Sequence, residues 1–311
     1  MNSRSPCFQS AVLLLLALTL CVRVAGAEAF RVATYNLEGY LDQPTETRPA
    51  KLAVAKAKVR ESILTLKPDV LAVQEMGSTN ALLELRDSLK AEGLDLPYWE
   101  QVNGSDTNIH VAILSRFPFT ARHPHTDDSF LLSGRRFRVS RGFGEVEIQV
   151  NTNYSFTLIA AHLKSKRAVA QADEAEMRLE EAKLLRERID ACFTAKPNIN
   201  LIVLGDFNDT KDSASTKAVI GRGKHKLVDT RPGEHNGDNT PSTHPASEPR
   251  NVTWTHYYGK ADSYSRIDYI LISTGMAREW ITNETYALTL PNWGVGSDHR
   301  PIVAAFEAED K

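Results

Sequence analysis

Short runs of apolar, β-branched and aromatic residues outnumber amphipathic stretches in this sequence, and the two kinds do not alternate one for one. Strands are predicted at residues 30–36, 69–75, 111–115, 143–150, 156–163, 201–206, 251–257, 266–272, 278–288 and 301–306. Helical spacing of apolar side chains occurs only at residues 52–66, 82–89 and 172–189. This ratio argues against a doubly wound parallel sheet and predicts an α/β fold with two packed sheets and helices outside.

Helix boundaries and loops support one domain spanning residues 28–311. Pro68 ends the first predicted helix, and Ser78 or Thr79 is placed to cap the second. With 42% hydrophobic and 24% charged residues, the 311-residue chain has enough apolar material for a large core. The polar segment 231–250 is long for an interior loop, so we expect either a surface lid or an insertion.

The N-terminus has the features of a secretory signal peptide. Arg4 precedes an apolar run at residues 11–22, and small residues at 25–27 predict cleavage after Ala27. We therefore expect a secreted or periplasmic protein beginning at Glu28. The alternative is a lipoprotein anchored through Cys21, but the bulky residue before it disfavours lipoprotein processing. Cleavage would leave Cys192 as the one cysteine, which we expect to be a small buried residue.

The net charge of the chain does not indicate a protein that binds polyanions. Removal of residues 1–27 takes away two arginines and no acid, leaving 35 basic and 39 acidic side chains and a formal charge of −4. Nucleic acid contacts would therefore have to come from a local basic patch.

Acidic, amide and imidazole side chains recur where the predicted apolar strands end. They are Asn36, Glu75, His162, Asp206, Asn208, Asp268, Asp298 and His299. The clearest case is LIVLGDFN, in which a strand at 201–206 presents Asp206 and Asn208 on the same side of an extended chain. An Asx turn that stops the strand is an equally good interpretation of that motif alone. The whole set in this order is what predicts a site.

The ordered set resembles the endonuclease/exonuclease/phosphatase superfamily over residues 34–306, from TYNLEGY to SDHRPIVAAF. That superfamily includes pancreatic-type deoxyribonucleases, abasic-site endonucleases, inositol polyphosphate phosphatases and neutral sphingomyelinases. The resemblance implies a four-layer α/β sandwich, in which two packed mixed β-sheets are flanked by helices. It also places the active site at the mouth between the two sheets.

The resemblance also implies roles for individual residues. Glu75 matches the principal Mg²⁺ ligand, with Asn36 beside it, Asp298 in the closing SDH motif and Glu38 as a second acid near the metal. Asp206 and Asn208 match the acid and amide of the GDFN motif. Asp268 matches the carboxylate that orients His299, and His162 matches a histidine that faces the phosphate.

General chemistry agrees with a divalent-metal-dependent phosphodiester hydrolase. Mg²⁺ or Mn²⁺ takes oxygen ligands and keeps several waters, so Glu75 and Asp298 would suffice to hold it. A water deprotonated by Asp206 would attack phosphorus in line. The phosphate oxygens would accept hydrogen bonds from side chains of the same site. These donors are Asn36, Asn208, His162 and His299. Whether His162 also protonates the leaving group is left open by the sequence.

The substrate is less constrained. Arg135, Arg136, Arg138 and Arg141 form a stretch without acids, and Lys164 follows His162 closely, so Arg138 and Lys164 are candidate phosphate contacts. A solvated strand face is an equal interpretation of the arginines. Aromatic side chains at 254, 257, 258 and 293 would stack bases or touch a membrane, although Trp254 in a predicted strand favours the core.

We expect a monomeric nuclease cleaving DNA or RNA. The alternatives are a sphingomyelinase-like phosphodiesterase or phosphatase, for which no lipid-inserting hairpin is visible, and an inactive binding scaffold, which the filled site positions disfavour.

Overall fold

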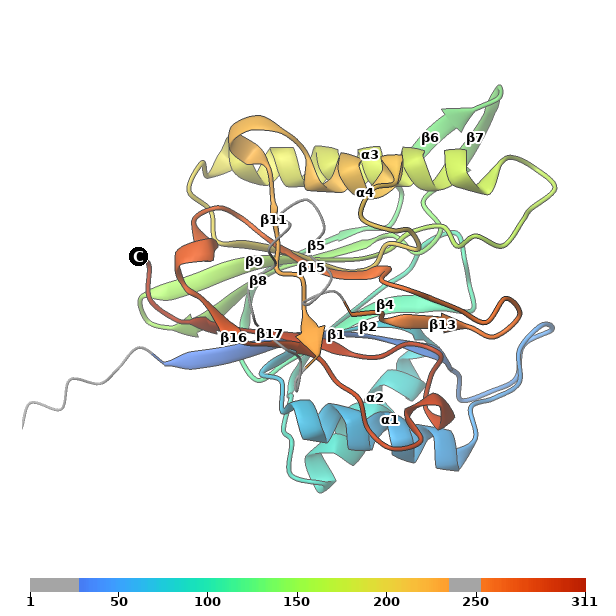
Figure 1. The fold of residues 1–311 in the computed structure, drawn as a ribbon, viewed down its shortest axis with the longest axis horizontal. Coiled ribbons are helices and arrows are strands. Elements are labelled where there is room, and N and C mark those ends of the chain that lie inside the picture. Colours follow the sequence, from blue (N-terminus) through green and yellow to red (C-terminus); the bar gives the residue numbers. More distant parts are fainter. Residues whose placement is uncertain (1–27, 235–252) are drawn as a thin grey trace, which may run out of the picture.

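The computed structural model describes residues 28–234 and 253–311, which form two β-sheets packed face to face with helices on both outer sides (Figure 1). This confirms the predicted four-layer α/β sandwich. The expected signal peptide and most of the 231–250 segment lie outside the described residues.

The first sheet has seven strands in the order β12-β16-β17-β1-β2-β4-β3. Their bounds are β12 (Gly233–Glu234), β16 (Trp280–Ala287), β17 (Ile302–Glu307), β1 (Ala29–Tyr40), β2 (Val70–Met76), β4 (His110–Ser115) and β3 (Tyr98–Val102). The central strand β1 runs parallel to β2 and antiparallel to β17, so the sheet is mixed.

The second sheet has six strands in the order β11-β15-β10-β9-β8-β5. Their bounds are β11 (Val228–Asp229), β15 (Asp268–Ile272), β10 (Leu201–Asp206), β9 (Tyr154–His162), β8 (Phe143–Asn151) and β5 (Phe119–His125). Here β10 is parallel to β9 and antiparallel to β15, so this sheet is mixed as well.

Alternation along the central strands builds the layers. In β10, Ile202 and Leu204 join the core between the sheets, whereas Leu201 and Val203 face the helices on the other side. Strand β1 divides its side chains in the same way between the inner core and the core under α1 and α2. Strands buried on both faces explain why these segments read as continuous apolar runs.

In the described part of the chain, four α-helices cover the outer faces. Helices α1 (Ala53–Leu66) and α2 (Thr79–Ala91) pack on the first sheet, and α3 (Glu174–Ala195) and α4 (Ala214–Ile220) on the second (Figure 1). As predicted, α1 ends just before Pro68, at a left-handed Lys67, and the Ser78 hydroxyl accepts a hydrogen bond from the Ala81 amide at the start of α2.

Several elements differ from the sequence-based prediction. The strand expected at 251–257 is wrong in its described part: only β13 (His256–Tyr258) forms, and it pairs with β14 (Ser263–Ser265) away from the two main sheets. Strands β3 and β5, helix α4 and the hairpin of β6 (Ser129–Leu132) and β7 (Arg135–Arg138) were not predicted. These elements are short or exposed on one side, which weakens their apolar pattern.

Three short 3₁₀ helices complete the described chain: η1 (Gly223–His225), η2 (Met276–Arg278) and η3 (Trp293–Val295). Cys192 on α3 is buried, and burial followed by the charge of Glu145 raises the pKa of its thiol to about 12, as expected for a structural cysteine. Within residues 28–234 and 253–311, every helix is too short or too polar to span a bilayer.

Candidate active site

The polar strand ends of both sheets meet at one edge of the sandwich. Asp206 at the end of β10 lies opposite His162 of parallel β9 and opposite Asp268 of antiparallel β15. Asn36, Glu38, Glu75, Asp206, Asn208, Asp298 and His299 all line one open cleft of about 550 Å³. The structure therefore brings seven of the nine residues predicted for the catalytic and metal positions to one cavity wall, and Asp268 and His162 lie behind it.

Asp206 is the centre of this arrangement. Gly205 before it has a φ of 129°, and a Cβ there would lie 2.0 Å from the Ala161 carbonyl oxygen, so only glycine fits this strand end. The Asp206 side chain is 1% exposed, and its Oδ2 lies 2.9 Å from Asn36 Nδ2 and 3.8 Å from His299 Nε2. Burial, followed by the charge of Asp268, raises the pKa of Asp206 to about 7.

Asn208 does not continue an extended chain, contrary to the prediction. Its φ is 54°, and its amide donates to Asp206 Oδ1 at 2.8 Å, which is the Asx turn considered as the alternative. The turn is nevertheless part of the site, because Asn208 Nδ2 donates to the Leu163 carbonyl at 3.0 Å and lies 3.3 Å from Asp206 Oδ2. The GDFN motif is therefore both an Asx turn that ends the strand and a part of the site.

His299 forms a buried pair with Asp268. Its Nδ1 lies 2.8 Å from Asp268 Oδ2, and Nε2 faces Asp206 and Asp298. Burial alone would lower the pKa of His299, but the charges of Asp268, Asp206 and Asp298 outweigh it and raise this pKa to about 10. The imidazole is therefore cationic at neutral pH, with Nδ1–H held by Asp268 and Nε2–H directed at the cleft.

Further side-chain oxygen atoms that could bind a metal line the same cleft. Glu38 Oε2 accepts the Asp298 amide at 3.1 Å, and burial followed by the charge of Asp298 raises the pKa of Glu38. Glu75 projects into the same cleft from the end of β2. With Asn36, this donor set consists of carboxylate and amide oxygens, which suits a hard divalent cation such as Mg²⁺ or Mn²⁺.

A family model for the endonuclease/exonuclease/phosphatase family matches residues 33–299, which include every one of these site residues. The chain belongs to this family. It is accordingly a phosphoesterase of a divalent-metal-dependent family. No curated protein matches the sequence at a significant level.

Solved structures share the family fold at low sequence identity. Truncated TDP2 from Caenorhabditis elegans is 16% identical with a TM-score of 0.59, covering 90% of this chain and 98% of that one. The human nocturnin catalytic domain with bound sulfate is 18% identical with a TM-score of 0.59, covering 90% and 95%. The Neisseria 3′ phosphatase NExo, bound to a product DNA hairpin, is 17% identical with a TM-score of 0.57, covering 89% and 99%.

Three residues that were predicted to contact the substrate phosphate lie outside the wall of the cleft. His162 is 1% exposed and sits behind Asp206 rather than in the cleft wall, with Nε2 3.5 Å from Asp206 Oδ2. Burial, followed by the charges of Arg141 and nearby cations, lowers the pKa of His162 well below its usual value. The lowered pKa favours a neutral imidazole, which contacts Asp206 from the buried side.

Arg138 and Lys164 also depart from the cleft. Arg138 lies on the β6–β7 hairpin, where it bonds Asp127 and the Thr126 carbonyl. Lys164 is 7% exposed, and its Nζ donates to the carbonyls of Ser165 and Arg167 in a neighbouring groove. Neither residue is part of the cleft wall.

Sequence reasoning missed three residues that line the cleft: Arg48, Lys51 and His256. Arg48 pairs with Glu75, and Lys51 donates to the Glu38 carbonyl at 3.1 Å. His256 Nε2 lies 3.6 Å from Asp298 Oδ2, and an isolated β-bridge holds His256 against His299. The cations follow the end of β1 in a loop without a pattern, so the sequence offered no signal for them.

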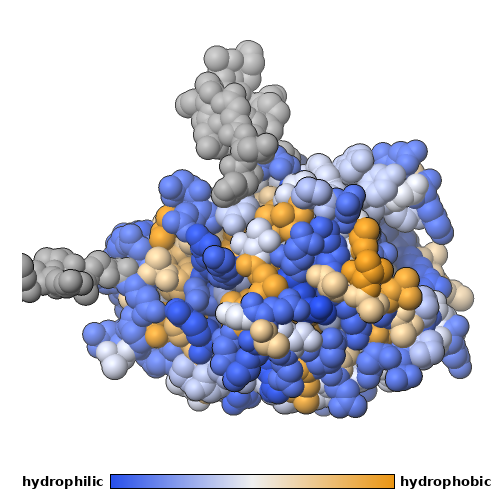
Figure 2. Space-filling model, turned by 90° about the horizontal axis from the view of Figure 1, so that it is seen from below, coloured by the Kyte–Doolittle hydropathy of each residue, from blue (hydrophilic) through white to orange (hydrophobic). Residues whose placement is uncertain are grey.

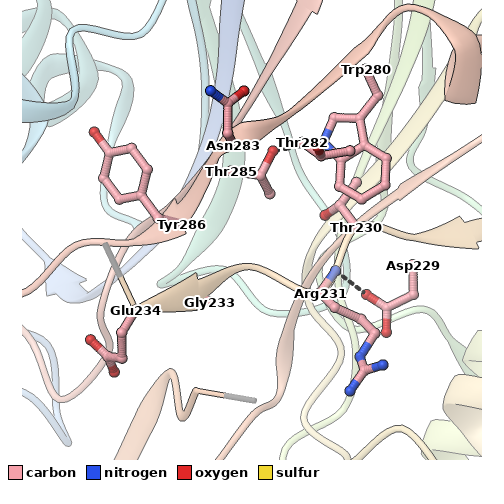
Figure 3. A pocket seen from close by; sticks show the side chains of 10 residues that line it. All are labelled: Asp229, Thr230, Arg231, Gly233, Glu234, Trp280, Thr282, Asn283, Thr285 and Tyr286. Atoms are coloured by element: carbon pink, nitrogen blue, oxygen red, sulfur yellow. Dashed lines mark hydrogen bonds between the residues drawn. The ribbon is translucent and has the colours of Figure 1, made fainter. Parts of the chain in front are cut away.

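A second cavity, of about 260 Å³, lies at the edge formed by β11, β12 and β16 (Figure 3). Some of its polar groups contact one another or the core: the Arg231 amide donates to Asp229, the Trp280 indole donates to Thr285, and Glu234 pairs with Arg300. None of the predicted site residues reaches it. The convergent acids, amides and imidazole of the first cleft therefore mark the active site.

Proposed function

We propose that this protein is an exported phosphodiesterase that cleaves nucleic acid with Mg²⁺ or Mn²⁺. The observation that carries the chemistry is the nearly inaccessible Asp206 carboxylate, held beside the cationic His299 in a cleft that Glu38, Glu75 and Asp298 also line. A base with a pKa of about 7 and a charged hydrogen-bond donor are the two groups that water attack on a phosphodiester needs.

The chain's own residues have separable roles in this proposal. Asp206 takes a proton from the attacking water, and Asn36 and the Asn208 amide fix the orientation of its carboxylate. His299 donates from Nε2 to a phosphate oxygen, and Asp268 stabilises the charge on that imidazole. His162 is a neutral group that contacts the Asp206 carboxylate on the side away from the cleft.

Glu75, Glu38, Asp298 and Asn36 would hold the divalent ion, which supplies charge neutralisation to the phosphate and its leaving oxygen. Arg48 contacts Glu75, so this carboxylate has a cationic partner in the protein itself. Four carboxylates line the cleft beside Arg48, Lys51 and His299, and a divalent ion would offset their negative charge next to a bound phosphate.

Three exposed arginines support nucleic acid as the substrate. Arg135, Arg136 and Arg138 occupy one strand of a hairpin that projects beside α3 (Figure 1). The Ser133–Gly134 turn, with φ of 49° and 76°, and two hydrogen bonds from Arg188 to Asp128 fix this hairpin on the domain. These exposed cations would suit contacts with the backbone phosphates of a polyanion, and a structure of a family relative holds a product DNA hairpin.

A panel of substrates tests this proposal. The mature chain is assayed with plasmid DNA, RNA, sphingomyelin and a bis-aryl phosphodiester, each with and without metal. Cleavage of DNA or RNA should weaken as salt rises, because cation contacts release counterions, and replacing the three hairpin arginines together should make that salt slope shallower. Faster hydrolysis of sphingomyelin than of nucleic acid, with an arginine variant that behaves like the parent, would refute the nuclease assignment.

A lipid phosphodiesterase is the second candidate, because the hairpin also carries Leu131, which is 64% exposed beside the arginines. This combination suits an anionic membrane surface. The beta toxin of Staphylococcus aureus shares the fold at 18% identity, with a TM-score of 0.57. The opposite face, over α1 and α2, is mostly hydrophilic, with apolar side chains in small separate groups (Figure 2). Leu52 and Val54 at the start of α1 are exposed to a similar extent, 71% and 63%, so the apolar side chains available for lipid contact are not confined to the hairpin.

A further inference from the structure

One loop brings two cationic side chains to the carboxylates of the catalytic cleft. The loop joins β1 to α1 and supplies Arg48 and Lys51 to the cleft wall. Arg48 Nη1 pairs with Glu75 Oε2, whereas Lys51 Nζ donates to the Glu38 backbone carbonyl at 3.1 Å. Because Glu75 is the proposed principal ligand of the divalent ion, Arg48 contacts an oxygen atom of the group that the ion needs.

The Arg48–Glu75 pair is partly enclosed. The Glu75 side chain is 15% exposed and that of Arg48 33%, so solvent and salt screen the pair less than one on the open surface. Burial alone would lower the pKa of Arg48, but the charge of Glu75, followed by those of Asp106 and Asp298, outweighs it and raises this pKa. The guanidinium is therefore a permanently charged partner of Glu75.

Backbone contacts of the loop fix the position of Arg48. The Thr45 amide donates to the Arg48 carbonyl at 2.8 Å, and the Arg48 amide donates to the Thr45 hydroxyl at 3.1 Å, which closes a turn. The Lys51 amide donates to the Leu41 carbonyl at 3.0 Å and closes the loop as a whole. Gly39 packs beside the guanidinium, since a Cβ there would lie 3.5 Å from Arg48 Nη1. The place of Arg48 beside Glu75 is thus set by the fold of the loop.

A guanidinium and a divalent ion at one carboxylate oppose each other. Both are cations, and two cations held at short range in a partly buried site repel. By linkage, an ion that weakens the Arg48 contact is itself bound more weakly because of that contact. Arg48 also lines the neighbouring groove, where Asp106 is a further carboxylate. A displaced guanidinium therefore has negative charge nearby.

We propose that Arg48 is a built-in counter-ion of Glu75, which the divalent ion displaces, so that Arg48 sets how tightly the cleft binds the ion. The inference rests on the proposed metal-dependent function and adds a competitor to its metal site. Before an ion binds, Arg48 would offset part of the repulsion among the acids. That repulsion is evident at Glu38, where burial, then the charge of Asp298 and, more weakly, that of Glu75 raise the pKa.

Calorimetric titration of the mature chain with Mg²⁺ or Mn²⁺, without substrate, tests the competition. Arg48→Met should bind the ion at least about tenfold more tightly than the parent, because a charged hydrogen bond that competes for the ligand is lost. Lys51→Met is the matched control, since it removes one positive charge from the same cleft but keeps the Glu75 contact. The gain in Arg48→Met should exceed any gain in this control. Glu75→Gln should weaken binding and thereby locates the ion.

Thermal melts give a second measurement that needs no catalysis. In excess chelator, Arg48→Met should have a lower Tm than the parent, because Glu75 loses its charged partner. At one saturating Mg²⁺ concentration the Tm of the variant should rise by more than that of the parent, as linkage requires of the tighter binder. Arg48→Gln, which removes the charge and keeps a polar side chain, takes its place if Arg48→Met does not fold.

The outcomes separate this inference from the metal site itself. Equal affinity in the parent and Arg48→Met, or an equal gain in Lys51→Met, overturns the competition. Weaker binding by Arg48→Met also overturns it, because Arg48 would then position Glu75 for the ion. In each case the metal site stands if Glu75→Gln loses affinity. Unchanged affinity in Glu75→Gln, or no binding by the parent and Arg48→Met alike, refutes the metal site and the inference together.

Discussion

Asp268→Asn should change the pH dependence of kcat by removing the charge that keeps His299 protonated. The two side chains are 2.8 Å apart and both are buried, so little solvent screens their interaction. In the parent, activity should rise as Asp206 loses its proton near a pKa of about 7 and fall as His299 loses its proton near a pKa of about 10. The expected profile is a plateau between those limbs.

The magnitude follows from the protonated fraction of His299. With a pKa of about 10, about 99% of the imidazole is charged at pH 8, whereas the ordinary value of about 6.5 leaves about 3%. Without Asp268, burial lowers the pKa of His299 while Asp206 and Asp298 still raise it, and a return of this pKa to the ordinary value would lower kcat at pH 8 by about thirtyfold. The limb set by Asp206 should also move to lower pH, because Asp268 contributes to raising the pKa of that carboxyl.

The assay is kcat against pH at saturating metal and substrate, with circular dichroism at each pH to show that the variant stays folded. Asp212→Asn, at an exposed position outside the cleft, is the control. An alkaline limb that stays near pH 10 in Asp268→Asn would refute the role given to the pair. Loss of activity by the same factor at every pH would instead indicate that Asp268 only positions the histidine.

Four further predictions concern the site, the metal, the fold and export. Asp206→Asn and His299→Ala should each lower kcat by at least about a hundredfold with little change in the circular dichroism spectrum; near-parent kcat in both would mean that the site is misplaced. Glu75→Gln should raise the Mg²⁺ or Mn²⁺ concentration that gives half-maximal activity, and full activity of metal-stripped protein in excess chelator would contradict metal dependence. Arg300→Met should lower the free energy of unfolding by about 1–3 kcal/mol, because Arg300 is 1% exposed and donates to Glu234 and to the Leu288 and Trp254 carbonyls; a thermal melt unchanged from that of the parent would count against this. Mass spectrometry of the exported protein should find Glu28 at its N-terminus, whereas a lipid-modified cysteine there would support the lipoprotein alternative.

The layered fold could be predicted because its central strands are apolar on both faces. A segment such as 201–206 can lie only between two packed layers, and a polar residue at its end can lie only at the sheet edge. The convergence of Asp206, Asp268 and His299 follows from that, once register places the strand ends together. Exposed elements lacked this constraint, which is why the β6–β7 hairpin escaped prediction.

The missed site residues have a different cause. Arg48 comes from a loop in which nothing distinguishes it from any solvated arginine, and only the folded path of residues 41–52 brings it to Glu75. His256 was predicted to lie in a strand of the main sheets, whereas it lies in a separate two-stranded ribbon that packs on His299. His162 was identified by its place at a strand end, but its depth behind Asp206 depends on side-chain packing that a strand pattern does not encode.

The strained backbone at the site could not be predicted from the sequence, because the residues with positive φ angles there are not glycines. Glu38, Glu75 and Asn208 have φ angles of 48°, 57° and 54°, a conformation that costs a residue with a side chain about 1–2 kcal/mol. Strand register shifts at both Glu38 and Glu75. Regular alternation would direct these side chains into the core or under the helices. The left-handed turn at each strand end instead directs the carboxylate over the edge, into the cleft. The fold therefore tolerates strain at the three positions where the proposed chemistry requires a polar group to leave the sheet.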